Sequence, residues 1–343
     1  MTHRSWTLLV SLVLVLTLGL LGGLATVPYV ALRPGPTFDT LGVVAGKTVV
    51  DIRGTQTYPT GGHLNMTTIS VVDNISLFGA MGLWASGSSA LVPREEIFPP
   101  HLSQQQVEQQ NQQLFQDSES TAETAALRYL GYPTQVLVDR VFPDGASSGK
   151  LAVGDRLRTV AGTAVGTSQQ VVDVLAATRA GQVVQVGFQR GDGPPRQVTV
   201  RLGPGPQPSR GYLGIGLADR PDVNFDITIS LSDVGGPSAG LMFALSIVDK
   251  LTPGALAGNT FVAGTGEIGP TGDVGLIGGI PFKMMRARQA GATVFLVPAG
   301  NCDEAAARAP AGLRLVRVES LAAAVRALDA LRAGQQPPGC ASA

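Results

Sequence analysis

A serine and a lysine are the residues of this chain whose types and surroundings best suit catalysis. Ser238 lies in a turn of small residues, 235–240, that opens directly into an apolar, helix-forming run. Unpaired backbone N–H groups and the positive end of the dipole gather at such a helix start. Serine also caps helices without any catalytic role. The turn therefore predicts a nucleophile at a helix start, with simple capping as the alternative.

The base that would activate Ser238 is not expected to be a histidine. The turn fits the G-x-S-x-G pattern of nucleophile elbows, which require an acidic residue and then a histidine further along the chain. The three histidines, His3, His63 and His101, all precede Ser238. This order argues against such a triad and points to another base.

Lysine is the next candidate base, because burial lowers its pKa and the neutral amine then accepts a hydroxyl proton. The chain has four lysines: Lys47, Lys150, Lys250 and Lys283. Lys250 follows Ser238 on the same predicted helix and would lie about 18 Å away along its axis. Lys283 follows the sequence Gly-Gly-Ile-Pro-Phe, whose apolar side chains suit a desolvated amine. Elimination and environment both predict a Ser238–Lys283 pair.

These motifs resemble the proteolytic domain of the Lon family, whose serine lies in a G-P-S-A-G turn and whose lysine follows some forty-odd residues later in G-G-[LI]-x-x-K. The separation here is 45 residues. Two further segments match: Thr265 begins a T-G-E-I segment, and residues 287–292 read A-x-x-A-G-A. Gly235 departs from the aspartate that ATP-dependent members usually carry. The resemblance covers about residues 210–333, and the membrane-anchored bacterial YlbL group, which joins a PDZ module to a Lon-type domain, is closer still.

This resemblance implies a serine endopeptidase that works without its own ATPase. Ser238 would be the nucleophile and Lys283 the base, while backbone N–H groups near the serine would stabilise the oxyanion. Thr265 would hydrogen-bond the lysine amine, with Gly236 and Pro237 as supporting residues of the turn. Lon-type domains assemble in rings, so a homo-oligomer is implied in the same way. The expected substrates are proteins or peptides, with no cofactor and no metal.

Residues 134–203 resemble a bacterial PDZ domain. An L-x-x-G-D turn at residues 151–155 follows a predicted strand at 136–141, and a helix is expected at 168–178. Such modules capture extended peptide tails by adding a strand to a sheet edge. Tyr132 and the strand from Val136 are the first candidates for the groove. A packing module without a ligand is the alternative.

The N-terminal segment predicts a membrane anchor. No charged residue occurs between Arg4 and Arg33, and the apolar run is long enough to cross a hydrocarbon core of about 30 Å. A cleaved signal peptide is the alternative, with Gly23-x-Ala25 as its cleavage site. The flanking charges favour an N-terminus inside, which would place the catalytic region outside the cytoplasm as part of a single-pass protein of the cell membrane. There Cys302 and Cys340 would either pair, pinning the C-terminal tail, or stay free.

The predicted fold class is α/β (α+β) and multi-domain. We expect an anchor at 1–33, an α+β region at 34–133, the PDZ-like domain at 134–203, the Lon-like domain at 210–334 and a tail at 335–343. The Gln-rich helix at 103–130 is interpreted as a solvated connecting helix. Zero net charge and a pI near 6.8 indicate no nucleic-acid partner. The glycine motifs at 145–150 and 264–269 fail the requirements of nucleotide sites, so no nucleotide is expected. A non-catalytic PDZ scaffold and a serine esterase are the rival functions.

Overall fold

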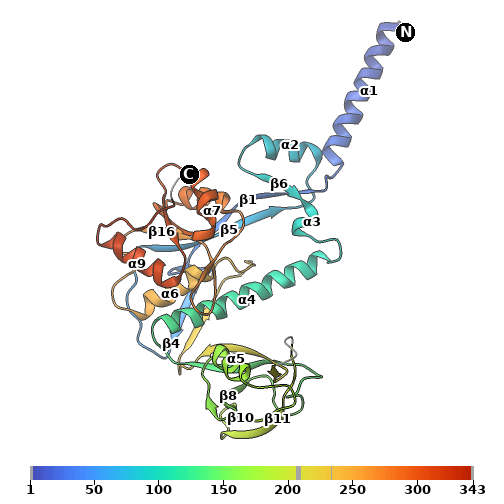
Figure 1. Cartoon of the computed structure of the whole chain (residues 1–343). Coiled ribbons are helices and arrows are strands. Elements are labelled where there is room, and N and C mark those ends of the chain that lie inside the picture. Colours follow the sequence, from blue (N-terminus) through green and yellow to red (C-terminus); the bar gives the residue numbers. More distant parts are fainter. Residues whose placement is uncertain (1–2, 206–209, 233, 341–343) are drawn as a thin grey trace. The chain divides into compact units, whose positions relative to one another are not determined.

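The computed structural model describes residues 3–205, 210–232 and 234–340, and the chain divides into two compact units (Figure 1). The first unit comprises residues 1–122 and 227–343, and the second comprises residues 123–226. The division differs from the expected one. Residues 34–122 join residues 227–343 in one unit, and the β-rich part extends to residue 226 instead of ending at 203.

A six-stranded sheet explains why the N-terminal region belongs to the first unit. Its strand order is β20-β19-β16-β5-β1-β6, in which β16, β19, β20 and β5 are parallel while β1 runs antiparallel to β5 and β6. The strands are β1 (Tyr29–Asp39), β5 (His63–Val72), β6 (Ala90–Pro93), β16 (Phe261–Gly264), β19 (Val294–Pro298) and β20 (Arg314–Val318). Because β5 pairs with β16, half of the sheet comes from residues 29–93, which therefore do not form a separate domain.

Helix α6 (Gly240–Leu251) is the central helix of this unit, and its residues 240–249 are all buried. β19 is likewise buried at all five positions, as expected of a parallel strand covered on both faces. The other helices of the first unit are α1 (His3–Leu24), α2 (Leu77–Ala85), α3 (Arg94–Ile97), α7 (Ile280–Gln289), the 3₁₀ turn η1 (Ala299–Asn301), α8 (Cys302–Ala307) and α9 (Leu321–Arg332).

Helix α4 (Gln104–Tyr129) is not the solvated connector that its sequence indicates. Its part within the first unit buries Val107, Phe115 and Ser118. The ring of Phe115 meets the ring of Phe243 in α6 edge to face, at 5.7 Å between centroids. Val107, Phe115 and Ser118 share one face of α4, so the abundance of glutamine conceals a packed helix.

The second unit is a β-rich module with its own core. Its main sheet has the order β11-β10-β8-β7-β14, with β9 paired to β8. The elements are β7 (Thr134–Val141), β8 (Asp155–Val160), β9 (Thr163–Ala164), α5 (Ser168–Ala176), β10 (Val183–Arg190), β11 (Arg196–Arg201) and β14 (Ile215–Pro221). β14 completes this sheet, which moves the boundary past residue 203. β7 is paired on both sides, so the expectation that the strand from Val136 lines a groove is wrong.

Short ribbons and a disulfide complete the fold. The ribbons pair β2 (Val43–Val44) with β3 (Lys47–Thr48), β4 (Val50–Arg53) with β15 (Asp226–Ile229), β12 (Gly203–Pro204) with β13 (Gly211–Tyr212), and β17 (Glu267–Ile268) with β18 (Val274–Gly275). Cys302 and Cys340 form a disulfide, and the Arg317 N–H of β20 donates to the Pro338 carbonyl at 2.9 Å. The tail therefore lies along the edge strand β20.

Candidate active site

The structure brings Ser238 and Lys283 together. Ser238 lies two residues before α6, and Lys283 lies in the first turn of α7. The distance between the Lys283 Nζ and the Ser238 Oγ is 2.8 Å. α7 starts from Gly279 in the left-handed conformation, with φ of 69°, and Pro281 occupies its first turn, where a missing N–H costs nothing. Two chain segments with strong local signals thus place the two side chains in contact.

The surroundings of Lys283 favour the neutral form of its amine. Its side chain is only 2% exposed, and burial lowers its pKa to about 7 from an ordinary value near 10.4. The positive end of the α7 dipole acts in the same direction, because it disfavours a cation in the first turn. Near neutral pH a large fraction of the side chain is therefore a free amine with a lone pair.

Thr265 determines which way that lone pair is used. Its hydroxyl donates to the Ser238 carbonyl at 3.0 Å, so its oxygen is left to accept an N–H from Lys283, whose Nζ lies 2.9 Å away. A neutral amine has one lone pair, and with an N–H directed at Thr265 that pair can accept the Ser238 hydroxyl proton. Thr265 directly follows β16, so the central sheet positions it.

The glycines of the serine turn meet two separate demands. Gly236 has φ of 84°, which favours glycine, and its N–H donates to the Asn111 carbonyl of α4 at 2.9 Å. A Cβ on Gly240 would lie 2.7 Å from the Ile268 Cγ2, so only glycine allows α6 to begin this close to β17. The Ser238 carbonyl also accepts the Gly266 N–H at 2.9 Å. Hydrogen bonds at the Gly236 N–H and at the Ser238 carbonyl thereby fix the backbone of the serine turn.

Helix α4 contributes a contact that the sequence did not predict. The Ser118 hydroxyl donates to the Pro237 carbonyl at 3.0 Å, directly before the nucleophile candidate. Ser118 is 5% exposed and lies 119 positions from Pro237 along the chain. No local motif marks it, since a serine in a glutamine-rich helix is ordinarily a surface residue.

Ser118→Ala is expected to lower kcat/KM on a short peptide about threefold to tenfold, which corresponds to the loss of one hydrogen bond of about 1 kcal/mol. The Pro237 carbonyl would lose its donor, and the turn carrying Ser238 would be less firmly positioned. Thr121→Ala is the matched control, because the Thr121 hydroxyl donates only within α4, to the Asp117 carbonyl. Equal losses in the two variants would indicate that Ser118 acts through helix stability and not through the turn.

The buried lysine should also cost stability. Its folded-state pKa, about 7, lies below the unfolded value of about 10.4, so between these pH values the unfolded chain binds more protons and stability rises with pH. The cost is complete below pH 7, on the order of 4 kcal/mol, and vanishes near pH 10. Lys283→Met is therefore expected to melt at a higher temperature than the wild type at pH 6, with the difference shrinking towards pH 10. A difference independent of pH would contradict this ionisation.

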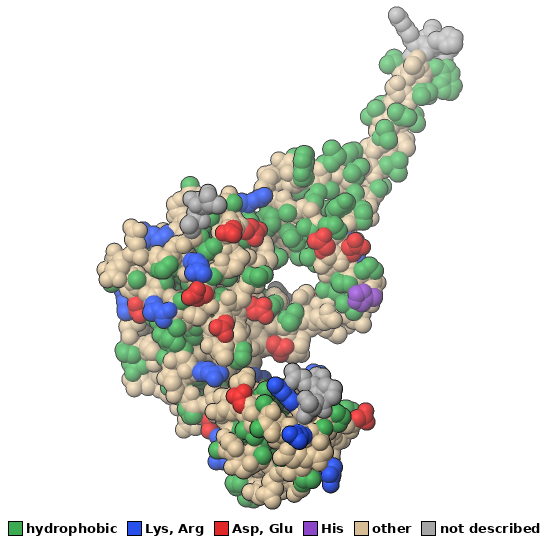
Figure 2. Space-filling model, in the orientation of Figure 1, with side chains coloured by type: hydrophobic (Ala, Val, Ile, Leu, Met, Phe, Trp, Pro, Cys, Tyr) green, Lys and Arg blue, Asp and Glu red, His purple; other side chains and the backbone are tan. Residues whose placement is uncertain are grey.

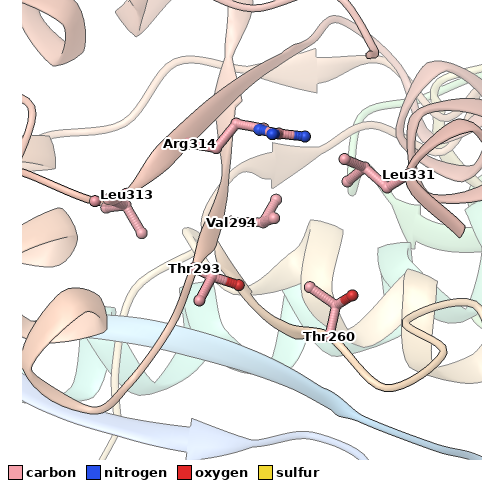
Figure 3. A pocket seen from close by; sticks show the side chains of 7 residues that line it. Thr260, Thr293, Val294, Leu313, Arg314 and Leu331 are labelled. Atoms are coloured by element: carbon pink, nitrogen blue, oxygen red, sulfur yellow. The ribbon is translucent and has the colours of Figure 1, made fainter. Parts of the chain in front are cut away.

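A pocket beside the sheet lies away from this pair. A cavity of about 550 Å³ is lined by Thr260, Thr293, Val294, Gly312, Leu313, Arg314 and Leu331, and Arg314 extends towards Leu331 across it (Figure 3). Thr260, Thr293 and Leu313 each precede one of the parallel strands β16, β19 and β20, whereas Thr265 follows β16. The pocket and Thr265 thus lie at opposite ends of these strands.

Residues 228–326 match the family model of the Lon protease (S16) C-terminal proteolytic domain. The chain carries a Lon-type proteolytic domain. Over 119 residues it is 35% identical to the Lon protease of Heliobacterium modesticaldum, a match that covers 33% of this chain and 14% of that protein. The Lon protease of Clostridioides difficile is 38% identical over 77 residues, covering 22% of this chain and 10% of that protein. This chain thus spans a small part of the length of these relatives.

The chain is also similar to solved PDZ domains. The PDZ domain of an SdrC-like protein from Listeria monocytogenes is 25% identical, with a match that covers 24% of this chain and 86% of that one at a TM-score of 0.23. The Lon-type match begins at residue 228, after the last residue of the second unit.

Proposed function

We propose that this protein is a membrane-anchored serine endopeptidase in which Ser238 and Lys283 form the catalytic dyad. The observation that carries the proposal is the 2.8 Å contact between the Ser238 Oγ and a buried lysine Nζ whose pKa is lowered to about 7. A structural ion pair would place a carboxylate beside the lysine, whereas here both hydrogen-bond partners of Nζ are hydroxyls. Such a pairing suits proton transfer.

The reaction follows from these contacts. The Ser238 Oγ bonds to the scissile carbonyl carbon as its proton moves to Lys283, and backbone N–H groups at the turn stabilise the oxyanion. The resulting ammonium returns the proton to the leaving amine as the C–N bond breaks, which leaves an acyl-enzyme ester. Water then attacks the ester carbonyl carbon and gives a proton to the Lys283 amine. Lys283 returns this proton to the Ser238 Oγ as the ester C–O bond breaks, so the carboxylic acid product leaves and Ser238 is restored. Every proton step uses Lys283, so no nucleotide is needed for the chemistry.

The anchor is α1, whose window Trp6–Leu24 is long and apolar enough to cross a membrane. We propose that it is retained and that the catalytic region lies outside the cytoplasm, which agrees with the Cys302–Cys340 disulfide because disulfides persist there. Homo-oligomerisation remains part of this proposal by resemblance to Lon-type rings.

The second unit is proposed to bind peptide tails of substrates or partners. β14 lies at the sheet edge, and α5 is tied to it because the Ser168 N–H and hydroxyl both donate to the Asp219 carboxylate, at 2.5 and 2.6 Å. An extended tail would add as a strand to the edge of β14 beside α5.

Replacing residues 123–226 by a Gly-Ser linker is expected to lower kcat/KM for tailed proteins about tenfold or more, while cleavage of short peptides stays near normal. The cut after Ala122 keeps the part of α4 that contains Ser118. Circular dichroism would confirm that the shortened chain folds. Equal loss on both substrates would indicate a structural role for the second unit.

The function is tested by incubating the full-length protein in detergent with an unfolded protein, without nucleotide, and following new termini by mass spectrometry. Wild-type protein should produce fragments and Ser238→Ala should not. A non-catalytic scaffold would produce no fragments and would not react at Ser238 with a serine-directed probe. An esterase would react with the probe and hydrolyse esters but leave the protein intact.

A further inference from the structure

Helix α2 exposes a set of large apolar side chains. Leu77, Phe78, Met81 and Trp84 are 45%, 51%, 58% and 73% exposed, and they share one face of the helix. Ala80, at the border of this face, is buried in a small cluster with Ala31 of β1 and Ile75. α2 is therefore packed against the protein through Ala80 and Leu83, while Leu77, Phe78, Met81 and Trp84 stay largely exposed.

The position of α2 is fixed relative to the end of α1. The Leu77 N–H donates to the Ala25 carbonyl at 3.1 Å, and the Val27 N–H donates to the Ile75 carbonyl at 3.0 Å. The ring of Phe78 lies against buried Gly22, where a Cβ would come within 2.5 Å of it. The start of α2 is thus hydrogen-bonded to the residues that directly follow α1.

The segment around α2 has the composition of a membrane interface. Residues 74–93 contain no Asp, Glu, Lys, Arg or His. Charged residues flank this segment directly: Asp73 precedes it and Arg94 follows it, and the two form an ion pair at 2.8 Å. Figure 2 shows hydrophobic side chains gathered over this region and continuing along α1. Trp84, the most exposed of the four, is of a residue type enriched at the level of lipid headgroups.

From this continuity we propose that α2 is embedded in the outer leaflet of the bilayer that α1 crosses, with Phe78, Met81 and Trp84 at the boundary of headgroups and acyl chains. The proposal rests on the retained anchor of the proposed function. In this arrangement α1 crosses the membrane, whereas α2 is embedded in its surface to a depth of about 5–10 Å. The first unit then has two attachments to the bilayer. A second attachment restricts the swivelling that a single span allows, so the sheet containing β1 is held at a defined height above the lipid.

Trp84 is itself the probe. The chain has two tryptophans, so Trp6→Phe leaves only Trp84 and Trp84→Phe leaves only Trp6. Each full-length variant is reconstituted at one copy per phosphatidylcholine nanodisc, with lipids brominated either near the headgroup or deep in the acyl chain. We expect Trp84 emission to be shifted to the blue and quenched at least twofold by the shallow bromines, and less by the deep ones. The two variants should melt at the wild-type temperature.

Trp6 reports on the anchor independently. If Trp6 is quenched by brominated lipid while Trp84 emits as in water and is quenched only by iodide, the proposal is overturned and the anchor stands. If neither is quenched, both fail together. If Trp84 becomes protected only when several copies share a disc, a second copy of the chain covers α2 and the lipid proposal is wrong.

Discussion

Ser238→Ala is expected to lower kcat for peptide hydrolysis by about 10⁴-fold or more, the scale seen when a nucleophile is removed from a serine peptidase. Lys283→Ala should lose a similar amount, because without the amine nothing at 2.8 Å accepts the serine proton. The double variant should be little worse than either single one, since residues that act as a unit give strongly non-additive losses. The measurement is kcat on a fluorogenic peptide, with thermal melting to confirm folding.

Two further lysine variants sharpen this test. Lys283→Arg should also fail, because a guanidinium is not deprotonated at working pH and has no lone pair to offer. Lys250→Ala is the matched control, since Lys250 lies in the last turn of α6, at the far end from Ser238. Near-normal turnover in Lys283→Ala together with a large loss in Lys250→Ala would mean that the base has been misassigned.

The Ser238–Lys283 contact could be predicted from sequence because the residues around each of the two side chains define the helix start that positions it. Small residues before an apolar run define the start of α6, and Gly279 and Pro281 define the start of α7. The elimination of the histidines and of Lys250, together with the apolar residues around Lys283, then favours one pair. The sequence does not predict that the Thr265 hydroxyl donates to the Ser238 carbonyl and accepts from Lys283, because this depends on where the Ser238 carbonyl points.

The supporting structure could not be predicted in the same way, because it depends on contacts between distant segments. β5 pairs with β16 across about 200 residues, and neither strand carries a signal for its partner. Ser118 contacts Pro237 from a helix whose glutamines indicate a solvated surface. β14 follows the expected end of the PDZ-like domain, yet it hydrogen-bonds to β7 and completes that sheet. In each case tertiary packing overrides the local pattern.

The pH dependence of kcat/KM should follow the ionisation of Lys283. Burial lowers its pKa to about 7, and only the neutral amine can accept the Ser238 proton. Below the pKa the neutral fraction falls tenfold per pH unit, so kcat/KM should be about one tenth of its plateau at pH 6 and about one hundredth at pH 5. It should be level from about pH 8 upwards. An unperturbed lysine would instead give a rate still rising at pH 10.

The ionisation of Glu119 must be distinguished from that of Lys283 in the pH profile. Burial raises the pKa of Glu119 to about 7 as well, and Glu119 is next to Ser118 on α4. Glu119 becomes charged in the same pH range in which Lys283 becomes neutral, so the two ionisations would give rates of the same shape if both mattered. In Glu119→Gln the carboxylate is absent at every pH, and the rise through pH 7 should persist. If that variant gave a flat profile with its fold intact and chemistry rate-limiting, the titration would belong to Glu119, and the proposal of a neutral lysine as base would lose its main kinetic support.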